Sequence, residues 1–164
     1  MGGGIRMDGA RGKKMREILF RGQTRKKGQK VWMDGTPVDG EWVYGGVLQG
    51  VGDFSIIYGS KNQNDPGEDL QKWCVYTDTL CQFTGLTDKN GTKIFEGDIV
   101  DCWSEGVNAK GTVQQRKDGL WIIYPAWQKT IMWGLCPDEY CHTTVEVIGN
   151  IHDNPELLEV TDNA

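Results

Sequence analysis

The stretch that decides the fold runs from Gln82 to Trp103 and reads QFTGLTDKNGTKIFEGDIVDCW. At its centre, Asn90-Gly91 is typical of a tight hairpin turn, because both residue types tolerate positive φ angles. Glu96-Gly97-Asp98 has the composition of a second turn, and the β-branched pair Ile99-Val100 opens a further strand. The stretch therefore predicts strand, hairpin, turn and strand, the local pattern of a small β-barrel.

Similar signals extend along the chain in both directions. Asp118-Gly119 predicts a second hairpin between two apolar runs. Asn154-Pro155 predicts a short terminal helix, since asparagine caps helices and proline fits the first helical position. Alternation of apolar and polar residues predicts further strands, and Thr77-Asp78-Thr79 predicts a helical turn. These further strands cover residues 15–20, 31–33, 40–48, 54–58, 73–76 and 141–151.

The composition favours β structure in a chain of 164 residues with 23 glycines, seven tryptophans, five tyrosines and four phenylalanines. We expect an all-β protein, with an irregular N-terminal β unit over residues 15–80. An SH3-like barrel with the terminal helix is expected over residues 81–159. Residues 1–14 are rich in glycine and basic residues and are expected to form a disordered extension or tag.

Several short motifs resemble the YopX family of proteins encoded by bacteriophages and prophages. The similarity extends over most of the chain, from about Met15 to Glu159, although residues 29–39 are longer than the family pattern. The resemblance implies a phage or prophage accessory protein, and it implies no catalytic residues. The motifs are Met15 to Gly22, Gly40 to Gly45, Gln82 to Leu86, Asp88 to Gly91, Ile94 to Val100, Val145 to Ile151 and Asn154 to Leu158.

Catalytic and metal-binding patterns are weak. Glu96, Asp98 and Asp101 cluster in sequence, but turn composition explains them better than acid-base chemistry, and no nucleophile or nucleotide-binding motif accompanies them. The five cysteines have spacings that fit structural zinc poorly, including the most suggestive group of Cys136, Cys141 and His142 with His152. We expect no enzyme activity, no cofactor and no metal.

Charge is divided unevenly along a chain whose net charge is −5. Residues 1–30 carry ten lysine or arginine residues against two acids, whereas residues 31–164 carry eight against twenty-one. A basic arm can pair with the acidic body of its own or a neighbouring subunit, or it can neutralise phosphates. For the second alternative, the nucleic-acid-binding residues are Arg21, Arg25, Lys26, Lys27 and Lys30.

Seven tryptophans exceed what one small core hides comfortably, so some are expected at a partner or subunit interface. The candidates are Trp42, Tyr44, Trp127 and Trp133. We favour a non-enzymatic binding or assembly module that forms homo-oligomers and binds a phage or host protein; nucleic-acid binding is the alternative, and an enzyme of unknown reaction is the second alternative. The chain lacks a long apolar run and a signal-peptide pattern, which predicts a cytoplasmic protein without a membrane span.

Overall fold

The computed structural model describes residues 16–29, 39–104, 106–125 and 132–159, and it confirms the all-β class. In this part of the chain the helices are the short 3-10 turns η1 (Thr77–Thr79) and η2 (Pro155–Leu158). The strands are β1 (Phe20–Arg25), β2 (Glu41–Leu48), β3 (Phe54–Ser60), β4 (Gln71–Tyr76), β5 (Cys81–Thr87), β6 (Lys93–Phe95), β7 (Asp98–Ser104), β8 (Val107–Gln115), β9 (Trp121–Pro125), β10 (Trp133–Gly134) and β11 (Glu146–Asn150).

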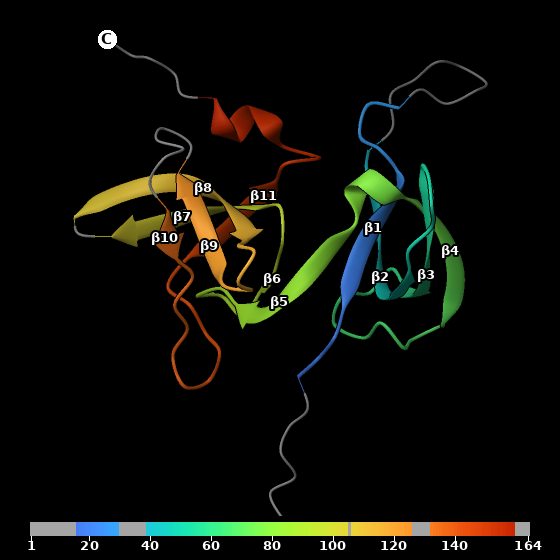
Figure 1. The fold of residues 1–164 in the computed structure, drawn as a ribbon, viewed down its shortest axis with the longest axis horizontal. Coiled ribbons are helices and arrows are strands. Elements are labelled where there is room, and N and C mark those ends of the chain that lie inside the picture. The colour runs from blue at the N-terminus through green and yellow to red at the C-terminus, as the bar shows by residue number, and fades with distance from the viewer. Residues whose placement is uncertain (1–15, 30–38, 105, 126–131, 160–164) are drawn as a thin grey trace, which may run out of the picture.

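The strands form two antiparallel sheets that lie side by side in Figure 1. The first has the order β4-β3-β2-β1-β5-β6 and the second the order β10-β9-β8-β7-β11. Strand β5 pairs with β1 through Phe20 with Gln82 and Arg21 with Cys81. Strand pairing thus continues across residues 80 and 81, where the sequence predicts the boundary between two units.

The predicted hairpin turns are confirmed. Gly91 and Gly119 have φ angles of 82° and 89°, which glycine adopts without strain. The buried side chain of Asp88 accepts hydrogen bonds from the backbone N–H groups of Asn90 and Thr92, each at 2.8 Å. It also accepts one from the N–H of Val147 at 3.0 Å, so the same carboxylate fixes the hairpin and attaches it to β11.

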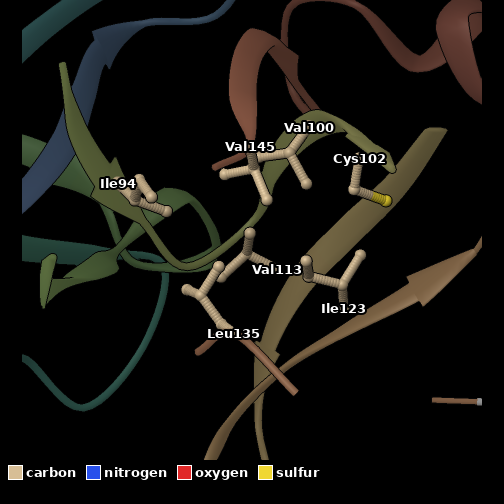
Figure 2. Close-up of a cluster of buried hydrophobic side chains, with 7 residues drawn as sticks. All are labelled: Ile94, Val100, Cys102, Val113, Ile123, Leu135 and Val145. Atoms are coloured by element: carbon tan, nitrogen blue, oxygen red, sulfur yellow. The ribbon is translucent and has the colours of Figure 1, made fainter. Parts of the chain in front are cut away.

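Each sheet has its own apolar core. On the second sheet, buried side chains of its strands and connections converge with Ile94 of β6 in one cluster, as Figure 2 shows. They are Ile94, Val100, Cys102, Val113, Ile123, Leu135 and Val145. In the first sheet Val43, Ile57 and Val75 form a separate cluster with 0% exposure. A third cluster around Phe95 lies where the sheets meet, and it includes Leu19, Cys81 and Phe83.

Three local predictions need correction. The first strand begins at Phe20 and continues through Arg25, where the sequence predicts a basic turn, because pairing with β2 holds these residues extended. The terminal helix is confirmed as η2, but Asn154 does not cap it; its Oδ1 accepts from the N–H of Asn150 at 3.4 Å. The closing strand begins at Glu146. The strand predicted at residues 31–33 lies outside the described residues.

Candidate functional site

A buried ion pair joins the two sheets. Arg21 of β1 donates from Nη2 to Oδ1 of Asp98 in β7 at 2.6 Å, and the two side chains are 8% and 1% exposed. The guanidinium carbon lies 4.6 Å from the ring centroid of Trp42 and 4.7 Å from that of Phe95. Burial disfavours the charge on Arg21, but Asp98, together with Cys81 and Tyr44, opposes this effect and the pKa of the guanidinium is raised. A cation is therefore held inside the protein.

A second carboxylate completes this contact. Asp153, which follows β11, accepts hydrogen bonds from Trp42 Nε1 and Gln23 Nε2, each at 2.7 Å, and from Asn150 Nδ2 at 3.0 Å. Burial alone would raise the pKa of Asp153, but these donors hold it below its ordinary value. The ionised carboxylate ties β1 and β2 to the end of β11. We call the residues of this contact the junction: Arg21, Gln23, Trp42, Phe95, Asp98, Asn150 and Asp153.

A cysteine and a histidine lie next to the junction, with Cys81 Sγ 3.9 Å from His152 Nε2. A nucleophilic cysteine needs an accessible thiolate, usually paired with a protonated histidine. Burial raises the pKa of the Cys81 thiol, and burial together with Arg21 lowers the pKa of His152. Both shifts favour the neutral forms, and Cys81 is only 3% exposed. The pair therefore has neither the charge state nor the access that nucleophilic catalysis requires.

One face of the first sheet is covered by the junction at one end and is open at the other. Side chains of even number on β2, β3 and β4 share this face, because Ile56 pairs with both Leu48 and Cys74. Trp42 and Tyr44 of β2 lie on the covered end, where Tyr44 stacks 5.7 Å from the Phe95 ring. Further along, Leu48 of β2 and Phe54 and Tyr58 of β3 are exposed. Tyr76 of β4 is half-buried, with Lys26 Nζ 4.7 Å from its ring centroid and Gln29 Nε2 donating to its hydroxyl at 3.1 Å.

The uncovered part is apolar. Leu48, Phe54 and Tyr58 are 61%, 53% and 48% exposed, although they lie within regular strands. The rings of Phe54 and Tyr76 are held 5.1 Å apart, so part of this surface is already ordered. Contiguous exposed apolar surface commonly marks an interaction site. We call this surface the open face, and it consists of Leu48, Phe54, Ile56, Tyr58, Cys74 and Tyr76.

A family model described as YopX protein matches residues 38–159, which include the strands of the open face and the whole second sheet. The chain belongs to the YopX family. The crystal structure of protein EF1440 from Enterococcus faecalis is 22% identical, with a TM-score of 0.41; the match covers 88% of this chain and 100% of that chain. Comparison with curated proteins gives no match. Within the described residues, no helix has the length and apolarity needed to cross a membrane.

The sequence motifs that resemble the YopX family meet at the junction. Arg21 comes from the opening motif, Trp42 from the next, Phe95 and Asp98 from the central one, and Asn150 from the closing one. Residues separated by more than 100 positions thus contact one another, as in the hydrogen bond between Trp42 and Asp153. In this YopX chain these motifs encode the contact between the sheets.

The interface residues predicted from sequence lie in different places. Trp42 donates to Asp153, which follows β11, and the Tyr44 ring lies 5.7 Å from that of Phe95 in β6, so both side chains contact their own chain. Trp133 of β10 is half-buried and packs against the core of the second sheet. Trp127 lies outside the described residues. The tryptophan surplus is therefore partly explained by the junction, which uses Trp42 as a cover for Arg21.

The cations proposed to bind nucleic acid are used largely within the chain. Arg21 is buried. Arg25 and Lys26 form ion pairs at 3.3 and 2.6 Å, and Lys27 donates to a backbone carbonyl. Lys30 lies outside the described residues. The partners are Asp98 for Arg21, Glu41 for Arg25, Asp78 for Lys26 and the carbonyl of Asp153 for Lys27.

The turn interpretation of Glu96-Gly97-Asp98 is confirmed. Gly97 has a φ angle of 79°, and Asp98 Oδ2 accepts from the N–H of Phe95 at 2.8 Å. Alternation along β7 places Asp98 and Asp101 on opposite faces of the sheet. Cys136 and Cys141 are free and exposed. Within the described ranges, no three histidine, cysteine or acidic side chains are grouped as metal ligands would be.

Sequence reasoning missed the open face, although a signal was present. In Phe54-Ser55-Ile56-Ile57-Tyr58, alternation gives three large apolar residues to one face and Ile57 to the other. A strand with apolar residues on both faces must be covered on both sides or leave one side exposed. Here Ile57 fills the core, and the other three side chains form much of the open face.

Proposed function

We propose that this YopX chain is a non-enzymatic accessory protein of a phage or prophage that acts as an oligomeric binding or assembly module. The observation that carries the proposal is the open face, where large apolar side chains on β2 and β3 and the thiol of Cys74 on β4 are exposed to solvent. Covering such a surface is favourable by about 25 cal/mol per Å² of apolar area removed from water. Apolar surface that the partner buries in the same contact adds a favourable free energy of the same size per Å².

The polar groups of the junction support a structural role over catalysis. Asp98 and Asp153 accept all their hydrogen bonds from their own chain, and Cys81 is buried as a neutral thiol. A catalytic acid, base or nucleophile must reach a substrate. The cations of β1 and the turn after it are paired within the chain, which favours a protein partner over nucleic acid.

The proposal is tested by measuring molar mass with light scattering at low and high salt. We expect the wild-type chain to have a mass above that of the monomer. The double variant Leu48→Ser with Phe54→Ser should dissociate it, because both side chains lose apolar contact area. The expected increase in the dissociation constant is about a hundredfold or more.

A matched control removes two exposed apolar side chains elsewhere. Leu120 and Tyr140 are 58% and 72% exposed and lie outside the open face. The double variant Leu120→Ser with Tyr140→Ser should keep the wild-type mass. A monomeric wild type at both salt concentrations, or equal effects of the two double variants, would contradict the proposed module. Strong salt-dependent binding of DNA by a monomer would favour the nucleic-acid alternative.

A further inference from the structure

The turn at the end of β11, residues 150–153, places a histidine against the first sheet. The side chain of Asn150 accepts hydrogen bonds through Oδ1 from the backbone N–H groups of His152 and Asp153, each at 3.0 Å. We propose that this turn is an acid-sensitive latch: protonation of His152 releases the turn from β1 and β2 and uncovers the buried thiol of Cys81. Such a latch operates in a monomer as well as in an oligomer.

Asp153 attaches the turn to the first sheet. Its carboxylate accepts hydrogen bonds from Trp42 Nε1 and Gln23 Nε2, and its backbone carbonyl accepts one from Lys27 Nζ. Because the same side-chain oxygen bonds both backbone N–H groups, His152 and Asp153 are held in one turn. A displacement of the imidazole therefore draws the neighbouring carboxylate away from its donors on β1 and β2.

The imidazole of His152 is half-buried among side chains of the first sheet. Its ring meets that of Trp42 edge-on, with the centroids 5.7 Å apart, and its Nε2 lies 3.9 Å from Sγ of Cys81. The guanidinium carbon of Arg21 lies 4.6 Å from the centroid of the same Trp42 ring. A protonated His152 thus shares one indole with a cation that is already buried.

The charges around His152 favour its neutral form while the turn is closed. Burial and Arg21 lower the pKa of His152, with Lys26 acting in the same direction, whereas Asp78 and Asp153 oppose them. Both carboxylates already have partners, since Asp78 pairs with Lys26 at 2.6 Å and Asp153 accepts from its donors on the first sheet. The thiol of Cys81, on β5, is neutral because burial raises its pKa.

Opening the turn changes this balance. Once released into solvent, His152 regains an ordinary pKa near 6.5, so the open form takes up a proton that the closed form resists. Acid therefore favours the open turn. Release also frees Trp42, which lies in the same row of β2 as Leu48, so acid extends the apolar surface of the open face.

Two buried thiols form a matched pair for measuring this change. Cys81 lies beside the turn and is 3% exposed. Cys102 lies in the core of the second sheet, is 5% exposed, and donates from Sγ to the carbonyl of Ala109 at 3.1 Å. Release of the turn uncovers the first thiol, whereas only opening of the second core uncovers the other.

Thiol labelling measures the latch in the unmodified chain. N-ethylmaleimide reacts first with the exposed cysteines 74, 136 and 141, and peptide mass spectrometry then follows Cys81 and Cys102 separately. Acid slows the reagent with both uncovered thiols alike, so the ratio of their rates reports the opening at Cys81. We expect this ratio to rise by about three- to tenfold from pH 7.5 to 5.5, since one proton changes an equilibrium by at most about tenfold per pH unit.

Two substitutions test the assignment to His152. His152→Gln removes the titrating group and should hold the ratio within about twofold across this pH range. His152→Lys carries a positive charge throughout, so its ratio should already be high at pH 7.5 and should rise little in acid. His142→Gln, at an exposed histidine outside this turn, is the comparison variant.

Several results would overturn the latch. A wild-type ratio that stays constant does so without any variant, and equal acceleration of Cys81 and Cys102 would indicate global unfolding instead. A rise that persists in His152→Gln would assign the step to another group, such as the buried carboxyl of Asp98. Loss of the rise in His142→Gln to the same extent as in His152→Gln would also contradict it.

Discussion

One face of the first sheet has a covered half and an open half, which differ in whether their own chain shields the large side chains from solvent. In the covered half, Trp42 contacts Asp153 after β11, Tyr44 packs on Phe95 of β6, and a buried ion pair fixes the contact between the sheets. In the open half, Leu48 and Phe54 continue the same face, and they remain exposed. The difference shows that β2 carries two surfaces in one strand. One is specified by charge and hydrogen bonds within the chain, and the other is exposed.

The largest expected effect is the loss of the ion pair that fixes the covered half. Asp98→Ala leaves the Arg21 cation buried without its partner, so the free energy of unfolding should fall by about 3–5 kcal/mol. Urea denaturation followed by circular dichroism measures this change. Lys26→Ala removes an exposed ion pair with Asp78 and should cost about 1 kcal/mol or less. Equal losses in the two variants would show that the junction is no more important than the surface.

The next largest effect is a difference in stability loss between substitutions on the two faces of the first sheet. Ile57→Ala, at a side chain with 0% exposure, should lower the free energy of unfolding by about 2–5 kcal/mol. Leu48→Ala, at a side chain with 61% exposure, should change it by about 0.5 kcal/mol or less in dilute protein. Urea denaturation at concentrations where the chain is monomeric gives both values. A large loss for Leu48→Ala would mean that its own chain covers the open face.

The smallest effect is a dependence of the free energy of unfolding on pH, which we assign to His152 in the covered half. His152 has a pKa lowered by burial and by Arg21, with Lys26 acting in the same direction and Asp78 and Asp153 opposing. The unfolded chain therefore takes up a proton near pH 6.5 that the folded chain resists. Stability should fall as the pH drops below about 6.5, by no more than about 1.4 kcal/mol per pH unit.

His152→Gln removes this titrating group and should flatten the fall in stability between pH 7.5 and 5.5. His142→Gln, at an exposed histidine outside the covered half, is the comparison variant. Thermal unfolding at a series of pH values compares the slopes, which are independent of the constant cost of each substitution. Identical slopes in all three proteins would show that the covered half is not the source of the pH dependence.

The sequence predicted those structural features that depend on residues close to one another along the chain. The hairpin turns at Gly91 and Gly119 and the helical turn at Thr77 were all readable, because short-range geometry decides them. Alternation also placed Val43 on the face opposite Trp42 and Tyr44. The junction was not readable, because Arg21 meets a partner 77 residues away and Gln23 one 130 residues away. A buried arginine and a surface arginine look alike until their partners are known.

The distance along the chain between the parts of the junction has a consequence for synthesis. Trp42 is made 111 residues before Asp153, and at roughly 5–20 residues per second this interval lasts about 6–22 s. During that time Trp42 lacks its hydrogen-bond partner, so the apolar surface of the nascent chain is larger than that of the finished protein. Neighbouring ribosomes on one messenger RNA carry the same bare surface. The junction therefore sets a period in which growing chains must be kept apart.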